Sequence, residues 1–137
     1  MSVLISGKFL GKKFVEVTHG PSGATIVTDA PKDNEGEGSG FSPTDLVAAA
    51  LGSCMLTIMV NVAARTGLIL DGAHFTVEKH MITGPGRRIG ALPIQFHLPA
   101  GLSPESRDRL ERAAKTCPVH HSIHPDISVP LTFLYDL

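Results

Sequence analysis

The chain has no tryptophan, and aromatic residues make up only 5% of it. It also lacks an excess of charge of either sign, since 12 Lys and Arg oppose 13 Asp and Glu, for a net charge of −1. Without a basic surface, a protein cannot recruit nucleic acid or an acidic membrane through its net field. Few aromatic side chains also leave few platforms for stacking single-stranded bases. We therefore expect neither nucleic acid nor a membrane as a partner.

Cysteine is also scarce, with only Cys54 and Cys117 in the chain. Two cysteines are too few for a disulfide scaffold, and too few by themselves for a cysteine-based zinc site. Before any motif is considered, two small buried hydrophobic residues are the simpler interpretation. The N-terminus has no basic stretch followed by an apolar one, so no signal peptide is predicted and the expected location is the cytoplasm.

A length of 137 residues with 42% hydrophobic content predicts a single domain over residues 1–137. Strands are predicted over 2–10, 13–19 and 24–29, as a meander. A polar, acidic and glycine-rich stretch over 30–40 follows, and this composition is typical of a mobile loop.

A long helix is predicted next. Ser42 is a good N-cap, Pro43 suits the first helical position, and Asp45 completes a weak capping box three residues after the cap. No charged residue lies between Asp45 and Arg65, and Gly67 suits the C-terminal cap. The run is long enough to span a membrane. Its many small residues and its place between strand patterns favour instead a helix that is buried on most faces.

The second half of the chain returns to strand patterns over 73–81 and 88–98. A helix then opens at Ser103, a short one follows Cys117-Pro118, and the last strand covers 128–136. The element order is therefore βββ-α-ββ-αα-β. Because the strands are joined mostly by hairpin-type connections, we predict the α+β class with antiparallel sheets.

The long apolar helix also predicts the oligomeric state. One sheet of a domain this small covers one face of the helix, and a second copy of the chain covers another. We therefore expect a homodimer.

The two cysteines occupy places that suit redox chemistry. Cys54 lies in the middle of the long helix, and Cys117 lies at the N-cap of the short helix that begins at Pro118. The backbone N–H groups and the helix dipole at that N-cap are expected to lower the pKa of Cys117. Such a pair suits a peroxidatic thiol, which becomes a sulfenic acid, and a resolving thiol, which condenses with it to a disulfide.

Two motifs carry a family resemblance. Residues 42–54, S-P-T-D-L-V-A-A-A-L-G-S-C, closely resemble the first-cysteine helix of the OsmC/Ohr family, the osmotically inducible and organic hydroperoxide resistance proteins. Residues 110–120, L-E-R-A-A-K-T-C-P-V-H, resemble the second-cysteine segment of that family. The resemblance implies an OsmC-like fold, with antiparallel sheets packed around two central helices in an intertwined homodimer. The chain looks most like the OsmC-like branch.

The resemblance also implies an activity. The chain is expected to be a thiol-dependent peroxidase that reduces organic hydroperoxides in the oxidative stress response. Cys54 would be the peroxidatic residue and Cys117 the resolving one, joined by a disulfide after turnover. The reductant implied is a small dithiol or a lipoylated protein, and no metal or organic cofactor is implied.

The chain departs from the family pattern near the first motif. Well-characterised members carry a Glu directly after its Pro and an activating Arg from the N-terminal strands. Here Thr44 and then Asp45 follow the Pro, and residues 1–64 contain no Arg, so that Lys12 and Lys13 are the nearest cations. Asp45 lies on the opposite helix face from Cys54, about 13–14 Å along the axis. It therefore either caps the helix or reaches the active site of a partner chain.

Two other functions fit parts of the sequence. Cys117, His120 and His124 are metal-ligand types, and two histidines four residues apart on a helix face the same way. No second ligand motif accompanies them, so no metal is predicted. A non-enzymatic protein that binds a small hydrophobic ligand in an apolar pocket is the main alternative. Such a carrier would bind hydroperoxide-like lipids without consuming peroxide.

Overall fold

The computed structural model describes residues 1–137 as two compact units, residues 1–47 and 48–137, whose boundary falls inside the long helix. The expectation of a single domain over 1–137 stays a prediction. Unit 1 contains three strands and a 3-10 helix: β1 (Ile5–Gly11), β2 (Phe14–His19), β3 (Thr25–Thr28) and η1 (Lys32–Asn34). The strands form an antiparallel meander in the order β1-β2-β3, close to the predicted ranges.

The meander of unit 1 has no hydrophobic core of its own. The only buried residues among the first 47 are polar, namely Thr28, Asp29 and Ser42. Large apolar side chains remain on its surface, including Leu4, Ile5, Phe9 and Phe41. These strands are therefore held in this unit by backbone ladders and turns rather than by apolar packing.

The glycine-rich loop after β3 is folded around one carboxylate. Asp29 Oδ2 accepts hydrogen bonds from the Ser39 backbone N–H (3.1 Å) and the Ser39 hydroxyl (2.9 Å). These donors, the Ser39 N–H above all, outweigh desolvation and hold the pKa of Asp29 below its usual value. The segment predicted as a mobile connector thus has one well-defined anchor.

The long helix, α1 (Pro43–Thr66), has the predicted ends. The Ser42 backbone N–H donates to Asp45 Oδ2 (2.9 Å), and the Asp45 N–H donates to Ser42 Oγ (3.1 Å), which is a reciprocal capping box. At the other end, Gly67 has a φ of 72°, a left-handed conformation that glycine adopts without strain. Both ends of α1 are therefore set by local residues.

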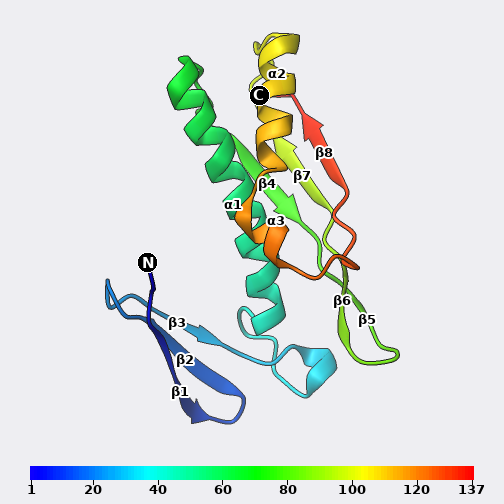
Figure 1. The fold of residues 1–137 in the computed structure, drawn as a ribbon. Coiled ribbons are helices and arrows are strands. Elements are labelled where there is room, and N and C mark those ends of the chain that lie inside the picture. The colour runs from blue at the N-terminus through cyan, green and yellow to red at the C-terminus, as the bar shows by residue number, and fades with distance from the viewer. The chain divides into compact units, whose positions relative to one another are not determined.

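Unit 2 contains the remaining elements: β4 (His74–Val77), β5 (His80–Ile82), β6 (Arg88–Ala91), β7 (Ile94–His97), α2 (Pro104–Ala114), α3 (Pro118–Ser122) and β8 (Leu131–Leu134). Strands β4, β7 and β8 form one sheet, and β5 and β6 form a separate ribbon. Figure 1 shows α1 and α2 side by side against the β4-β7-β8 sheet. These features confirm the predicted α+β class.

Two details of the strand prediction were wrong. The strands expected over 73–81 and 88–98 are each divided, so four strands stand between the long helices instead of two. Pro93, which has no N–H for a ladder, separates β6 from β7, and its carbonyl accepts the Glu78 N–H at the matching break between β4 and β5. In addition, β8 pairs parallel to β7, because the chain returns to the sheet through α2 and α3 rather than through a hairpin.

The core of unit 2 lies between α1 and the sheet. α1 buries Leu51, Met55, Met59 and Ala63, which recur every four residues and so share one helix face. Other buried residues come from the sheet and from α2, including Ile94, Phe96, Leu98, Leu110 and Ala114. α1 is also long and apolar enough to cross a membrane, but the core helix of a soluble protein passes the same test.

Gly52 allows the closest contact in this core. A Cβ atom at Gly52 would lie 2.2 Å from Cε2 of Phe75 on β4, which is far inside van der Waals contact. The small residue in the helix therefore makes room for an aromatic ring of the sheet.

Replacing Gly52 with alanine is expected to destabilise the protein. Overpacking costs about 1–3 kcal/mol, which outweighs the gain of about 1 kcal/mol in helix propensity. We expect Gly52→Ala to lower the free energy of unfolding in urea, whereas Ser53→Ala, at the neighbouring exposed position, leaves it nearly unchanged. An equal or more stable Gly52→Ala protein would contradict the close contact with Phe75.

Candidate active site

Cys54 lies in the middle of α1 and is half-buried. Its neighbours Leu51 and Met55 are fully buried, and Ser53 is exposed, so Cys54 lies at the border of the buried helix face. A thiol at such a border is held in place by packing and is still accessible to a reactant.

Cys117 ends the turn after α2 and is the N-cap of α3, as predicted. Its Sγ accepts a hydrogen bond from the His120 backbone N–H at 3.5 Å. The residue is 0% exposed. Pro118 at the first helical position fixes the chain direction there.

The structure brings the two free thiols close enough for the Cys54 side chain to affect the pKa of Cys117. Burial raises the pKa of Cys117, and the neighbouring Cys54 thiol raises it further, whereas the N–H groups of His120 and Val119 lower it. The net shift is upward. The expectation that the helix N-terminus lowers the pKa of Cys117 was therefore wrong, because desolvation outweighs the N-cap hydrogen bonds in a fully buried position.

A hydrogen-bond network fixes α2, the helix that leads into Cys117. The Tyr135 hydroxyl donates to Glu111 Oε2 (2.6 Å), and the Arg107 guanidinium lies over the Tyr135 ring at 4.1 Å from its centroid. Arg107 also donates to the carbonyls of Leu102 (2.9 Å) and Ala100 (2.7 Å). Burial and Glu111 together raise the pKa of Tyr135 well above its usual value. The sequence analysis did not find that these residues hold α2 in place, because no local sequence pattern relates Arg107 to Tyr135.

The other charged residues singled out in the sequence have partners within unit 1. Asp45 caps α1 within its own chain, and its role in a partner's site stays a prediction. Lys12 pairs with Glu37 (3.7 Å) and Lys13 with Glu35 (4.0 Å), both within unit 1.

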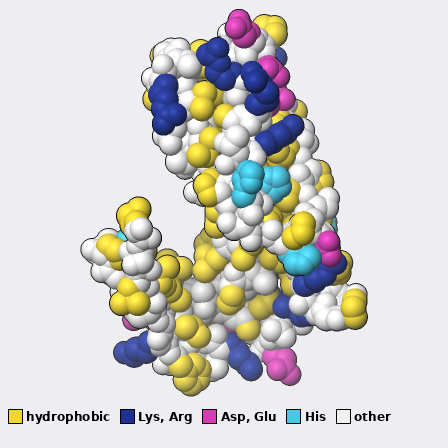
Figure 2. Space-filling view, viewed as in Figure 1, with side chains coloured by type: hydrophobic (Ala, Val, Ile, Leu, Met, Phe, Trp, Pro, Cys, Tyr) yellow, Lys and Arg dark blue, Asp and Glu magenta, His cyan; other side chains and the backbone are white.

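The histidines near Cys117 do not form a metal site. α3 ends at Ser122, so His124 lies beyond it and does not share a helix face with His120, as the sequence had suggested. The His124 Nδ1 instead accepts the Asp126 N–H at 3.1 Å. Figure 2 shows histidine side chains on the surface at α3, below the Lys and Arg side chains over α2. No group of three or more His, Cys, Asp or Glu residues is placed to hold a metal ion.

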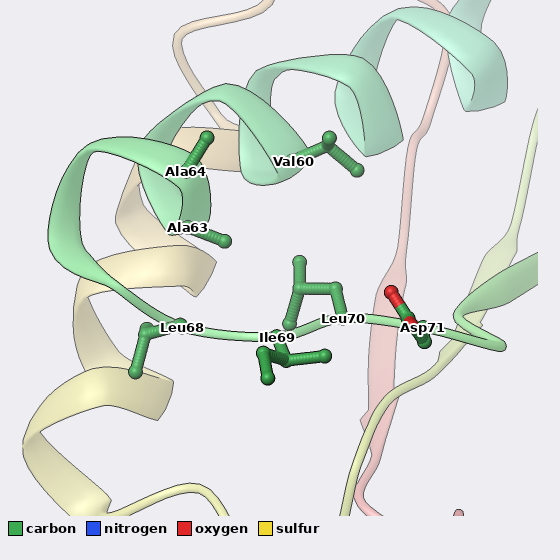
Figure 3. Close-up of a pocket in the computed structure, with 7 residues that line it drawn as sticks. All are labelled: Val60, Ala63, Ala64, Leu68, Ile69, Leu70 and Asp71. Carbon is green, nitrogen blue, oxygen red and sulfur yellow. The ribbon is translucent and has the colours of Figure 1, made fainter.

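A small cavity of about 260 Å³ lies at the C-terminal end of α1. Val60, Ala63 and Ala64 line it from the last turns of the helix, and Leu68 to Asp71 line it from the segment that follows (Figure 3). The side chains that line it are apolar except for Asp71, but backbone groups add a polar share to its surface. The cavity does not include either cysteine.

The different burial of the two thiols predicts different reactivity. In the native protein, iodoacetamide is expected to alkylate the half-buried Cys54 at least tenfold faster than the buried and more basic Cys117. Peptide mapping after brief labelling measures the ratio, and labelling in denaturant, in which the rates converge, is the control. Faster labelling of native Cys117 would contradict the structure.

Comparisons with known proteins agree with this fold. A family model described as OsmC-like protein matches residues 36–132. A crystal structure from Psychrobacter arcticus 273-4, provisionally described as an osmotic stress induced and detoxification response protein, is 36% identical, with a TM-score of 0.89 over 94% of this chain and 93% of that one. No curated protein sequence matches the chain.

Two more distant structures share the fold. The organic hydroperoxide resistance protein OsmC of Legionella pneumophila is 20% identical, with a TM-score of 0.79 over 98% of this chain and 97% of that one. The organic hydroperoxide resistance protein OhrB of Bacillus subtilis is 17% identical, with a TM-score of 0.69 over 97% and 98%. The matched model covers most of the chain and includes both cysteines, and the chain therefore belongs to the OsmC-like protein family.

Proposed function

We propose that this chain is a thiol-dependent peroxidase that reduces organic hydroperoxides, with Cys54 as the peroxidatic and Cys117 as the resolving residue. The observation that carries the proposal is the proximity of the two free thiols of one chain. The names of the Legionella and Bacillus proteins, which concern organic hydroperoxide resistance, support the same class of substrate. They also support a role in the oxidative stress response.

The different burial of the two thiols supports this order of reaction. Cys54 is half-buried and so can meet a substrate, whereas Cys117 is fully buried and its pKa is raised. Cys117 therefore keeps its proton at neutral pH. Its sulfur lies near that of Cys54, where it can attack once Cys54 has been oxidised.

The chemistry uses only these two sulfurs and an external reductant. The Cys54 thiolate attacks the outer oxygen of the hydroperoxide, the O–O bond breaks, and the alkoxide leaves as an alcohol after taking up a proton. Cys54 is then a sulfenic acid. The Cys117 sulfur attacks the Cys54 sulfur, and water leaves as the disulfide forms. A dithiol or a lipoylated protein reduces the disulfide by two electrons and two protons, as expected in a reducing cytoplasm.

We also infer that a second copy of the chain covers the exposed apolar surface. Unit 1 has no buried apolar side chain, and Phe9 on β1 is 69% exposed. Only 33% of the residues in the most apolar 18-residue stretch of α1 are buried inside the chain. A monomer rarely leaves so much apolar surface in contact with water. A homodimer resolves the mismatch, and the two central helices of the family fold supply its seam.

A hydrophobic ligand carrier is the second candidate, and the cavity beside Val60, which is lined mainly by apolar side chains, favours it. At about 260 Å³ it lies just below the range of about 300–1,000 Å³ that is typical of small-molecule sites. The cavity and the thiol pair are separate features, so binding without turnover remains a distinct outcome of the test below.

The peroxidase proposal predicts a change in intact mass. One equivalent of an organic hydroperoxide, such as cumene hydroperoxide, should remove two hydrogens from the reduced protein within seconds, because the thiols already lie close together. Peptide mapping should then link Cys54 to Cys117. An unchanged mass over many minutes would contradict the peroxidase and favour the carrier.

Two variants separate the roles in the same assay. Cys54→Ser should abolish hydroperoxide consumption, whereas Cys117→Ser should complete one turnover and accumulate a sulfenic acid that dimedone traps. Ser53→Ala, next to the reactive residue, is the control and should keep wild-type rates. Equal loss in both cysteine variants would break the assignment of roles.

The dimer proposal predicts an effect of charge on β1. Burying a phenylalanine contributes about 1.5–3 kcal/mol, so Phe9→Asp should raise the dimer dissociation constant at least about tenfold. Lys8→Asp, at the adjacent position on the opposite side of β1, is the matched control. Sedimentation velocity over a range of concentrations measures both. A monomeric wild-type protein, or a Phe9→Asp dimer of unchanged affinity, would overturn the inference.

A further inference from the structure

The cavity at the C-terminal end of α1 is large enough for a small organic molecule. Its volume is about 260 Å³, whereas a cavity of about 150 Å³ already holds benzene. Figure 3 shows the segment after the helix passing below its last turns, with Leu70 directed toward the helix and Asp71 beside it. The cavity therefore has one charged side chain at its edge.

The Asp71 carboxylate has no partner within the chain. Asp71 is exposed and makes no hydrogen bond or ion pair. Other acidic residues of unit 2 are paired, such as Asp108 with Arg112. Arg65, in the last turn of α1, is the nearest Lys or Arg in the sequence, but it does not line the cavity. The negative charge of Asp71 is therefore not offset by a cation in the cavity wall.

The end of α1 adds to this negative character. A helix carries roughly half an elementary negative charge at its C-terminus, on carbonyls that have no intrahelical partner. The Ala63 carbonyl accepts the Leu68 N–H at 2.9 Å, and no backbone N–H outside the helix reaches the carbonyls of residues 64–66. Carbonyl and carboxylate oxygens only accept hydrogen bonds, so the polar group that suits them is a charged N–H donor.

The other lining side chains favour an apolar body. They belong to Val60, Ala63, Ala64, Leu68, Ile69 and Leu70. Ile69 is 71% exposed and Val60 is 45% exposed, so apolar surface at the cavity is left in contact with water. A ligand that covers this surface removes it from water, which favours binding.

We propose that this cavity binds a small organic cation, whose primary ammonium group lies at Asp71 and whose short alkyl chain or single ring covers Val60 and Ile69. This ligand differs from the neutral hydrophobic ligand of the carrier hypothesis, which would leave the carboxylate and the helix carbonyls without a donor. The site is also independent of the proposed peroxidase chemistry, because neither cysteine lines the cavity.

Titration of the full-length reduced protein with n-hexylammonium, followed by methyl NMR spectra, tests the proposal. We expect saturable shifts of the methyl groups of Val60, Leu68 and Ile69, with a dissociation constant of about 1 mM or lower. 1-Hexanol has the same number of non-hydrogen atoms but no charge, and should bind about three- to tenfold more weakly. Hexanoate should bind more weakly still, because Asp71 repels it.

Three variants locate the site. Asp71→Asn keeps the shape of the side chain and removes its charge, so it should weaken n-hexylammonium binding about three- to tenfold and leave 1-hexanol binding unchanged. Asp126→Asn is the matched control, because it removes a charge from a 66% exposed side chain after α3. Ala64→Leu, at an exposed position of α1, should fill the cavity and weaken the binding of both ligands.

Several outcomes would overturn the proposal. They are a preference for n-hexylammonium that persists in Asp71→Asn, shifts confined to residues outside the cavity, and no saturation below about 10 mM. The protein is titrated in the oligomeric state that it adopts in solution, so a second copy that filled the cavity would appear as an absence of saturable binding. The variant with both Cys54→Ser and Cys117→Ser should bind n-hexylammonium as the wild type does, which separates this test from that of the peroxidase.

Discussion

The close approach of α1 to the sheet at Gly52 is the constraint on which the site in unit 2 depends. Without a side chain at Gly52, the Phe75 ring packs directly against the helix backbone. This contact sets the height of the helix above the strands, and Cys54 follows two residues later. The Tyr135–Glu111 hydrogen bond then fixes α2 against the same sheet, and the turn after α2 ends at Cys117. The two thiols lie close together because α1 and α2, the helices that position them, pack on the same sheet.

Local chemistry made much of this fold predictable. Ser42, Asp45 and Gly67 define the ends of α1 by hydrogen bonds and backbone conformations that involve only nearby residues. The family resemblance likewise rested on two contiguous motifs, and the matched family model covers both. The N-cap position of Cys117 followed from Pro118 alone. Helix ends, caps and short motifs, which depend on only a few neighbouring residues, could therefore be predicted from the sequence.

Features that depend on distant residues were not accessible. The pKa of Cys117 follows from its burial under tertiary packing and from the proximity of Cys54, 63 positions away, and local N-cap reasoning gave the wrong sign. The parallel pairing of β8 depends on the path through α2 and α3. The pairing of His74 with His97 depends on strand register. In each case the feature depends on a contact between segments far apart in the chain, and no motif in the sequence relates those segments.

The proximity of the thiols has a consequence for irreversible damage. A sulfenic acid that waits for its partner is open to a second oxidant, which converts it to a sulfinic acid that most cells cannot repair. In the proposed chemistry, the resolving Cys117 already lies near Cys54. Under the proposed mechanism, a sulfenic acid at Cys54 would be short-lived, and the buried Cys117 is itself shielded from oxidants. A peroxidase of this design would keep working at high oxidant concentrations rather than use overoxidation as a signal.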